Sequence, residues 1–599
     1  MTSQKFEMSR RRLMQTAGLG AAGVAGAGVL SACKADSPGG GGSGERRGTF
    51  TMVADMTPDA QHKNPLNEED ALLVYQAIAP LFYPKISNFN WSTGEYIPML
   101  GEVSMDEDAK LLTIKVKEGI KWTDGNDVTA ADVEGALLMD WANSDVNNPT
   151  WPYVDGIEVV DEQTVEVSFS TYFDRIEYWA AVRPAHSSVR YADNIAEARE
   201  LFEQGTDAWG SDAQSEYMAN LANLNFEDWI SCGPYKFESQ NDNTVVFTHN
   251  PDGLFADQVM FEKVAARAAG NTDVLNFIQT GEVDYSTNVV SPSDREALLG
   301  IDGVEQLEHK ALTGAGIALS NTRHPELADY NVRKAILHAM DRDGISQVAL
   351  GADGFTPNHY DSGYPVLHTE ELVSDLDGLT YYDYDLDKAT KAMEAAGWEK
   401  DGDKWVDPNG ETKKYALIAP EGWNDWIDAA TAAAKQLQEF GLNVEFQTVP
   451  HADIADMWVS GEYDMTMRHW GSPFRPMYSG SGEFAFLIEN LGTKSEPGMG
   501  VETEKVETEA YGEVNVRDIY EDASSNPDEE KLKEANEKLA VIFNETLPRL
   551  PLWEDRHLTQ YRTGNNIGKV EIDAGLADND PTRDNPLVLA LLNGKVTPV

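Results

Sequence analysis

Apolar residues recur with helical spacing in the stretch 321–345, and this pattern predicts an amphipathic helix. The residues of its apolar face are Val332, Ala335, Ile336, Ala339 and Met340. Asp329 is the expected N-cap, because its short carboxylate can accept hydrogen bonds from the first unpaired backbone N–H groups. Arg333 and Lys334 fall outside the stripe, and Gly344 marks the expected exit from the helix. By itself, the pattern indicates a helix that faces the core and carries no chemistry.

Similar patterns elsewhere predict an α/β protein. Alternating apolar and polar residues predict strands at 49–54, 111–116, 156–169 (a pair), 233–247 (a hairpin), 415–419 and 442–449. Helical spacing and capping residues predict helices at 71–79, from Thr129 to about 139, at 385–397, at 428–440 and at 528–545. The stretch 492–527 is rich in Gly, Glu and Ser, and is expected to form surface loops.

A short motif occurs twice. Residues 281–284, Gly-Glu-Val-Asp, and residues 461–464, Gly-Glu-Tyr-Asp, each follow a predicted helix and precede a predicted strand. Two copies so far apart suggest two lobes built from related α/β units. Chance similarity of a short motif is the alternative.

Length and charge restrict the class of protein. A chain of 599 residues is longer than one hydrophobic core usually supports, so two or more lobes are expected. The 101 acidic residues against 47 basic ones give a net charge of -54, which argues against nucleic acid as a partner because phosphate binding needs a basic face. An acid-rich surface is also common where salt is high, so a salt-tolerant source is one hypothesis.

The N-terminus resembles an export signal. Residues 9–14 resemble a twin-arginine motif, and a short run of small and apolar residues follows at 17–30. Residues 30–33 resemble the lipobox of bacterial lipoproteins, in which Cys33 receives the lipid and becomes the new N-terminus. A transmembrane anchor is the alternative. The other cysteine is Cys232, expected to be a small buried residue, so a lipidated Cys33 excludes an intramolecular disulfide.

Motifs for catalysis and metal binding are missing from the sequence. It contains no G-x-S-x-G, H-E-x-x-H or Walker A motif. Even the closest pair of its 11 histidines, His359 and His368, is too widely spaced to share a helical turn. Pairs of carboxylates are unavoidable among 101 acidic residues, so they cannot nominate a glycosidase site. We therefore predict no catalytic residue, no metal and no cofactor.

The remaining chemical signal is aromatic. Trp423 and Trp426 lie in a predicted loop between a strand and a helix, where α/β folds present ligand contacts. Further candidates follow the second Gly-Glu-x-Asp motif, and weaker ones lie in the first half of the chain. These candidates are Trp470, Phe474, Tyr478, Trp151 and Tyr153. An exposed aromatic ring can stack on a sugar or pack against a peptide side chain. The alternative for Trp423 and Trp470 is that they fill the core.

Several segments resemble the family 5 solute-binding proteins, the extracytoplasmic receptors of ATP-driven importers for peptides, nickel complexes and oligosaccharides. The similar segments are the 321–345 stretch, K-W-x-D-G at 121–125, T-A-x-D-V at 129–133, G-P-Y at 233–235, the stretch 381–398 and Leu550-Pro551-Leu552-Trp553. The resemblance covers about 49–599. It implies a two-lobed α/β fold of the periplasmic-binding-protein type (type II, cluster C) with an extra subdomain in the first lobe.

The resemblance also implies domain boundaries. Residues 1–32 would be a twin-arginine lipoprotein signal, and 33–48 a lipidated cysteine with a flexible Gly/Ser linker. Lobe I would span 49–311, with its extra subdomain at roughly 86–215, and lobe II would span 312–547. The final segment, 548–599, would return to lobe I. The lobes would be joined by two crossings, near 306–312 and near 548–553.

Members of this family differ in the class of ligand that they bind. Peptide-binding members resemble one another in an Asp soon after the strand that corresponds to 465–469, whereas this chain has no carboxylate there before Glu483. Its aromatic loops are more similar to members that bind cellobiose and related β-linked oligosaccharides. We therefore predict a monomeric, lipid-anchored receptor on the outer face of the cytoplasmic membrane, which passes a β-linked oligosaccharide to a membrane permease. The alternatives are an oligopeptide receptor, a secreted glycoside hydrolase and a purely structural surface protein.

Overall fold

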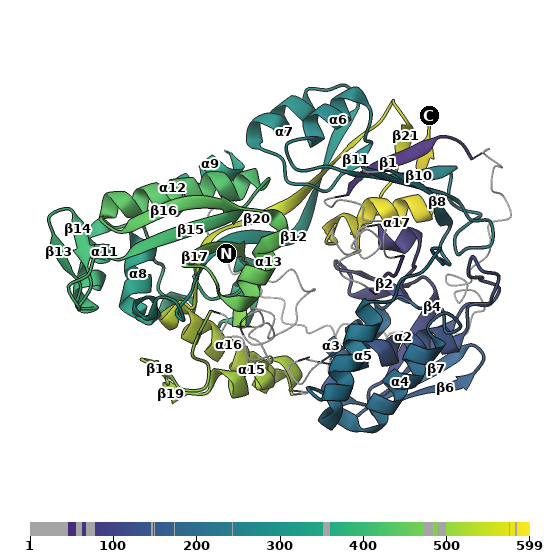
Figure 1. Cartoon of the computed structure of the whole chain (residues 1–599), viewed down its shortest axis with the longest axis horizontal. Helices are drawn as coiled ribbons and strands as arrows, with labels where there is room; N and C mark the ends of the chain where they lie inside the picture. The colour runs from purple at the N-terminus through teal and green to yellow at the C-terminus, as the bar shows by residue number, and fades with distance from the viewer. Residues whose placement is uncertain are drawn as a thin grey trace, which may run out of the picture.

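The computed structural model describes most of the chain from residue 46 to residue 599 (Figure 1). The gaps are 55–62, 67–77, 145–147, 149, 173, 242, 352–359, 471–482, 485–486, 488–498, 527, 574 and 582–583. The export signal, Cys33 and most of the helix predicted at 71–79 therefore lie outside the described residues.

One ten-stranded mixed sheet runs through both lobes, and two long strands cross between them (Figure 1). These crossing strands, β12 and β20, are antiparallel partners. In sheet order the strands are β16 (Asn443–Val449), β15 (Lys414–Pro420), β17 (Met465–His469), β12 (Val304–Leu319), β20 (Arg549–Arg562), β11 (Tyr285–Ser286), β1 (Thr49–Ala54), β10 (Lys263–Ala268), β9 (Thr244–His249) and β8 (Tyr235–Asn241). The predicted two-lobed α/β architecture is confirmed.

The first lobe contains both the start and the end of the described chain. β1 pairs in parallel with β10 and β11, while β8 and β9 form the predicted antiparallel hairpin. The C-terminal part adds α17, whose residues are all buried. The other elements of this lobe are α6 (Val274–Thr280), α7 (Pro292–Leu299), α17 (Pro586–Leu592), β21 (Ile567–Val570), β22 (Val596–Pro598) and the 3₁₀ turns η2 (Ala79–Leu81) and η7 (Leu576–Asp578).

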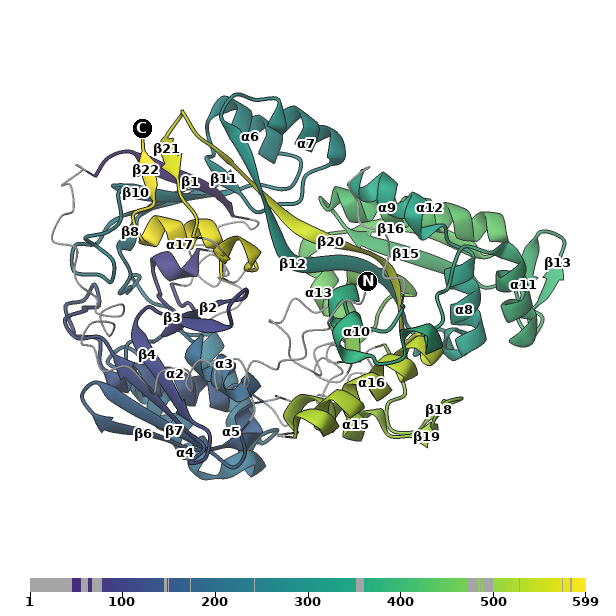
Figure 2. The same cartoon turned by 180° about the vertical axis from the view of Figure 1, so that it is seen from behind.

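A four-stranded antiparallel sheet with helices forms a subdomain in the lower part of Figure 2, across from α15 and α16 of the second lobe. Thr129 precedes α2 as predicted, and its N–H donates to the Asp132 carboxylate at 2.8 Å. The elements are β4 (Gly101–Asp106), β5 (Leu111–Val116), β6 (Val154–Asp161), β7 (Thr164–Phe169), α2 (Ala130–Ala142), α3 (Asp174–Ala181), α4 (Ala192–Glu203), α5 (Asp212–Ala222), η3 (Trp151–Tyr153) and η4 (Gly205–Ala208). A separate hairpin, β2 (Ser87–Asn90) with β3 (Glu95–Pro98), precedes them.

The second lobe surrounds its end of the sheet with helices. They are α8 (Tyr330–His338), α9 (Arg342–Leu350), α10 (Val366–Leu372), α11 (Leu386–Ala395), α12 (Asn424–Phe440), α13 (His451–Ser460), α15 (Val516–Ser525), α16 (Glu529–Thr546) and the 3₁₀ turns η5 (Pro325–Ala328) and η6 (Leu376–Gly378). Two hairpins complete it, β13 (Glu399–Asp401) with β14 (Lys404–Val406) and β18 (Val506–Thr508) with β19 (Gly512–Val514). The loops predicted at 492–527 were wrong where α15 lies, because Val516, Tyr520 and Ala523 form a buried helical stripe.

The single helix predicted within 321–345 is two helices, α8 and α9. The predicted apolar stripe is buried, and Asp329 accepts a hydrogen bond from the N–H of Asn331 at 2.8 Å, as expected of an N-cap. The chain then turns at Asp341, whose carboxylate accepts from the N–H of Gly344 at 3.1 Å and caps α9. Gly344 therefore lies inside the first turn of a second helix, so its prediction as the exit was wrong. A capping carboxylate can start a new helix without interrupting the apolar periodicity.

The repeated Gly-Glu-x-Asp motif has the same local structure in both lobes. Gly281 ends α6 and Gly461 ends α13, both in the left-handed conformation, with φ of 78° and 73°. Each motif leads into a strand, β11 in the first lobe and β17 in the second. The two lobes are therefore built on related α/β units at this point.

Candidate functional site

In the second lobe the carboxyl ends of β15 and β17 lie at the same edge of the sheet, and Trp423 and Trp426 meet there. β15 pairs in parallel with β16 on one side and with β17 on the other. α12, which follows β15, and α13, which precedes β17, lie on opposite faces of the sheet (Figure 1). Loops at such carboxyl ends are the usual ligand-binding positions of α/β sheets.

Four aromatic side chains meet at this edge. The ring centroids of Trp423 and Trp426 are 4.6 Å apart, and the His469 ring lies 5.5 Å from Trp423 and 4.9 Å from Trp426. Trp458 of α13 is 6.1 Å from Trp426. Trp426 is buried, whereas Trp423 is half-buried. Of the two predicted tryptophans, Trp423 therefore presents more surface to a ligand.

The early start of α12 explains why Trp426 is buried and Trp423 is only half-buried. The sequence predicted a helix from residue 428, but α12 begins at Asn424, directly after Trp423. Trp426 consequently lies in the first helical turn and packs into the core of the second lobe. Trp423, outside the helix, packs only at the margin of that core.

Asp425 lies between Trp423 and Trp426 in the chain. It is half-buried in the first turn of α12, where the helix dipole ordinarily favours an ionised carboxylate. Burial nevertheless raises the pKa of Asp425 to about 6, although hydrogen bonds from the backbone of Trp426 and of Asp425 itself lower it. A half-buried carboxylate that resists ionisation can accept a cationic group of a ligand, which would restore its charge.

Two basic residues, Arg468 and His469, contribute to the aromatic cluster from the end of β17. The guanidinium of Arg468 lies 4.2 Å from the centroid of the Trp458 ring. Burial lowers the pKa of Arg468 to about 10 and that of His469 to about 3, with further lowering of His469 by Arg468 and Arg549. His469 is therefore neutral at physiological pH and can act as a hydrogen-bonding group.

Glu483, the first carboxylate after β17, forms an ion pair with Arg549. Both side chains are almost wholly buried, at 0% and 2% side-chain exposure. Arg549 also donates a hydrogen bond to the carbonyl of His469. The carboxylate of Glu483 thus stabilises the beginning of β20.

The remaining predicted site residues lie apart from this cluster or outside the described residues. Trp470 is wholly buried against Gly314 and Gly316 of β12, with its indole Nε1 3.4 Å from a carboxylate oxygen of Glu554. Trp151 is buried in the core of the subdomain, with the half-buried Tyr153 packed against that core. Phe474, Tyr478 and Cys33 fall in gaps of the description, so their predicted roles stay predictions.

Trp458, Arg468 and His469 belong to the cluster, and Asp425 lies next to Trp426 in the chain, but none of the four was selected from the sequence. Arg468 and His469 end a predicted strand directly before Trp470, so the strand-end rule that selected Trp423 could have found them. Trp458 could not have been found in this way, because it lies in helix α13 and only the packing of that helix brings it to the cluster. Asp425 was one of 101 acidic residues, and only its burial distinguishes it.

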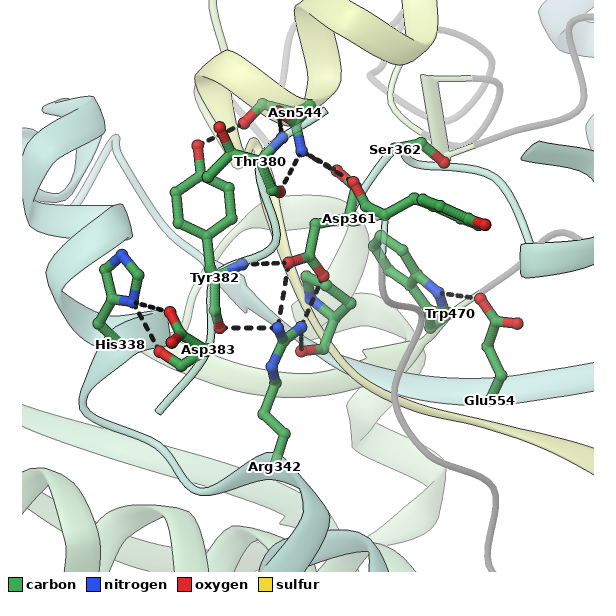
Figure 3. Close-up of polar contacts among 12 residues, drawn as sticks. His338, Arg342, Asp361, Ser362, Thr380, Tyr382, Asp383, Trp470, Asn544 and Glu554 are labelled. Atoms are coloured by element: carbon green, nitrogen blue, oxygen red, sulfur yellow. Dashed lines mark hydrogen bonds and ion pairs between the residues drawn. The ribbon is translucent and has the colours of Figure 1, made fainter. Parts of the chain in front are cut away.

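A buried polar network fixes the second lobe onto β20 (Figure 3). Arg342 forms a two-pronged ion pair with Asp361, Nη1 to Oδ1 at 2.6 Å and Nη2 to Oδ2 at 3.0 Å. Arg342 Nη2 also donates to the carbonyl of Tyr382 at 2.8 Å, and the amide of Asn544 in α16 binds three backbone carbonyls of the same region. Glu554 of β20 accepts from the N–H of Val366 at 2.9 Å.

We therefore expect the two lobes to move relative to each other where β12 and β20 pass between them. The β12–β20 pairing is irregular between Glu308 and Leu312, where residues 309–311 face the single residue His557 of β20. Such an irregularity interrupts the ladder hydrogen bonds and lets a strand bend. The irregular stretch of β12 falls within 306–312, one of the two segments predicted to connect the lobes, and the other predicted segment, 548–553, overlaps the start of β20 at Arg549.

Within the part of the chain that is described, no group of three or more His, Cys, Asp or Glu side chains is arranged to hold a metal ion. The same part contains no helix that is long and apolar enough to span a membrane.

The chain belongs to the bacterial extracellular solute-binding proteins of family 5. The model of the middle part of that family matches residues 95–486, more than half of the chain. The resemblance inferred from the sequence is thereby confirmed.

Curated relatives are similar at low identity. The chain is 22% identical to the oligopeptide-binding protein OppA of Bacillus subtilis over 343 residues, which cover 53% of this chain and 58% of OppA. It is 24% identical to the oligopeptide-binding protein AppA of the same organism, covering 61% of this chain and 64% of AppA. The chain spans 58–66% of the length of the first three curated relatives that it matches.

Solved structures match over nearly their whole length. A periplasmic oligopeptide-binding protein of Thermotoga maritima, solved with mannohexaose, matches with a TM-score of 0.70 at 19% identity, covering 92% of this chain and 99% of that one. AppA of Bacillus subtilis, solved with a nonapeptide, matches with a TM-score of 0.66 at 15% identity, covering 92% and 99%. At these identities the likeness shows the fold.

Proposed function

We propose that this protein is the substrate-binding component of an ABC importer. It captures an oligomeric solute between its lobes by hinge closure and delivers it to a membrane permease, while separate subunits hydrolyse ATP. The family membership and the irregular crossing of β12 and β20 support this function. Closure is driven only by the difference in the ligand's affinity for the closed and open states.

The favoured solute is a β-linked oligosaccharide, and the aromatic edge of the second lobe carries this choice. Trp423 is half-buried beside His469, so it can stack on a sugar ring while the neutral imidazole bonds a hydroxyl. The sequence has no carboxylate between His469 and Glu483, and Glu483 is already paired with Arg549. The mannohexaose in the Thermotoga maritima relative shows that this fold accommodates a sugar oligomer in that protein.

An oligopeptide is the second candidate, because a carboxylate does lie at the same edge. Asp425 is half-buried, and a peptide's amino terminus would compensate its burial. Several curated relatives are named as oligopeptide-binding proteins, which favours the same ligand. A peptide would then place its ammonium group at Asp425 and an apolar side chain on Trp423.

The remaining features of the function are proposals from the sequence. Lipid on Cys33 would hold the protein at the outer face of the cytoplasmic membrane, with residues 37–44 as a flexible tether. The protein would act as a monomer, without a cofactor and without enzymatic activity. Incubation with oligosaccharides that yields shorter products would contradict the last of these.

A thermal-shift screen of the purified protein tests the ligand class. The ligands are a set of β-linked oligosaccharides and a set of peptides of two to five residues, since a ligand that binds only the folded state raises the melting temperature. A shift with sugars that disappears in Trp423→Ala and persists in Asp425→Asn supports the oligosaccharide. A shift with peptides that disappears in Asp425→Asn supports the peptide instead. No shift with either set contradicts both.

A further inference from the structure

A pocket lies in the second lobe beside the end of β12 and the start of β20, since Asn321 and Pro548 contribute to its lining. Its lining comes from the start of α8, from residues 500–506 and from the end of α16. Figure 1 shows where α8, β18 and α16 lie in the second lobe. The volume of the pocket is about 80 Å³. Because one water molecule occupies roughly 10–15 Å³ of such volume, the pocket holds about half a dozen non-hydrogen atoms.

Arg333 is a buried cation in the wall of this pocket. Its side chain donates from Nε to the carbonyl of Leu327 and from Nη1 to the carbonyl of Thr546, both at 2.8 Å. Among the described residues, no carboxylate lies within ion-pairing distance of its guanidinium, and Nη2 makes no hydrogen bond. The residue is only 3% exposed, and burial lowers the pKa of Arg333 to about 10. A buried charge without a counterion is unfavourable, so this guanidinium has a strong tendency to bind an anion.

Asn321 lines the same pocket and has a hydrogen-bond acceptor that no described group uses. Its Nδ2 donates to the carbonyl of Gly500 at 3.3 Å, which leaves Oδ1 directed elsewhere. Oδ1 is buried, in a residue only 7% exposed, and accepts no hydrogen bond within the described part of the chain. Leaving such an acceptor unpaired is unfavourable, so a ligand with an N–H or O–H donor would be favoured.

Glu502 adds a negative charge at the rim. Its carboxylate accepts from the backbone N–H groups of Glu504 and Lys505, at 2.7 and 3.1 Å, which fixes its position. The rest of the lining is mostly apolar and includes Ala328, Val501, Val506, Val516, Phe484 and Pro548. The pocket thus presents a cation, an acceptor, an anion and an apolar wall to one small ligand.

We propose that this pocket binds a small zwitterion, namely a free α-amino acid with a short aliphatic side chain such as alanine. The ligand's carboxylate lies at Arg333, its ammonium group donates to Asn321 Oδ1 and faces Glu502, and its side chain packs on the valines. A simple anion such as phosphate or acetate satisfies only the guanidinium and meets the carboxylate of Glu502. A quaternary ammonium compound has no N–H to offer to Asn321. The site is separate from the ligand site proposed at Trp423, so the protein would sense an amino acid and an oligomeric solute independently.

Isothermal titration calorimetry of the purified protein with alanine, sodium acetate and glycine betaine tests this site. We expect saturable binding of alanine, and binding at least about tenfold weaker for the other two, because each lacks a charge-assisted hydrogen bond. Equal binding of betaine and alanine, or no saturable heat with alanine, overturns the proposal.

Two matched variants refine the test. Glu502→Gln keeps an acceptor oxygen for the backbone while removing the charge, and should weaken alanine binding by about tenfold with only a small decrease in the melting temperature of the unliganded protein. Glu504→Gln, at an exposed carboxylate outside the pocket, should leave alanine binding unchanged. Equal effects of the two substitutions contradict the proposal. Trp423→Ala should retain alanine binding, which separates this site from the oligomer site.

Discussion

Asp284 and Asp464 occupy equivalent positions in the two lobes. Each follows a left-handed glycine by three residues, and each carboxylate accepts a hydrogen bond from the backbone of the neighbouring parallel strand. Asp284 accepts from the N–H of Thr51 at 2.8 Å, and Asp464 accepts from the N–H of Ala416 at 2.9 Å. Their surroundings differ. Burial raises the pKa of Asp284 to about 6, whereas for Asp464 the effect of burial is outweighed by hydrogen bonds that lower its pKa.

The two aspartates should therefore affect stability with opposite pH dependence. Asp284 binds its proton more tightly in the folded state, so the stability that it contributes is lost as pH rises from about 4 to about 6, by about 1.4 kcal/mol per pH unit. The difference in unfolding free energy between wild type and Asp284→Asn, measured by denaturant titration, should fall over that range. Asp464 contributes stability above about pH 4, which is lost as pH falls below that value. A parallel pH dependence for Asp284→Asn and Asp464→Asn would contradict this account.

Removing the carboxylate of Asp361 should destabilise the second lobe severely. Asp361→Ala leaves the guanidinium of Arg342 buried without its counterion, and such losses cost about 3–5 kcal/mol. Glu445→Gln is the control, because its ion pair with Lys414 is solvent-exposed and contributes at most about 1 kcal/mol. The measurement is the unfolding free energy from denaturant titration. Similar losses in the two variants would show that the buried pair has no special role.

Substitution of Trp470 should mainly lower stability, whereas substitution of Trp423 should mainly abolish ligand binding. Trp470→Ala opens a cavity beside β12 and should lower the unfolding free energy by about 3–5 kcal/mol. Trp423→Ala removes a half-buried ring and should cost less than about 2 kcal/mol, while it abolishes the thermal shift with the oligomeric ligand. If Trp423→Ala retains full binding, then Trp423 fills the core instead, as the alternative in the sequence analysis allows.

Gly314 permits the close approach of β12 and β20. A Cβ atom at this position would lie 2.2 Å from the carbonyl oxygen of Trp553, so the backbone itself would have to move. Gly314→Ala should therefore destabilise the protein by about 1–3 kcal/mol. Gly270→Ala should change stability by less than about 0.5 kcal/mol, since its added Cβ would meet no atom closer than 3.9 Å. Thermal denaturation of both variants distinguishes these outcomes, and equal melting temperatures would contradict the close-approach argument.

The sequence by itself determined the class of fold and many of the elements. Strands, caps and the buried stripe of α8 follow from periodicity and from short polar side chains, which act within a few residues of each other. The same local rules placed Trp423 at the end of a strand. They could not distinguish the end of one helix from the start of the next at Asp341, because the apolar spacing continues through both helices.

Only the tertiary structure decided which side chains meet. Trp470 follows His469 directly, yet Trp470 packs on β12 while His469 joins the cluster of Trp423 and Trp458, because successive residues of a strand point to opposite faces. The surroundings of Arg333 are likewise invisible in the sequence, since its pocket brings together residues as far apart in the chain as Asn321 and Thr546. Burial and partners depend on such distant contacts, and they determine which polar groups remain available for a ligand.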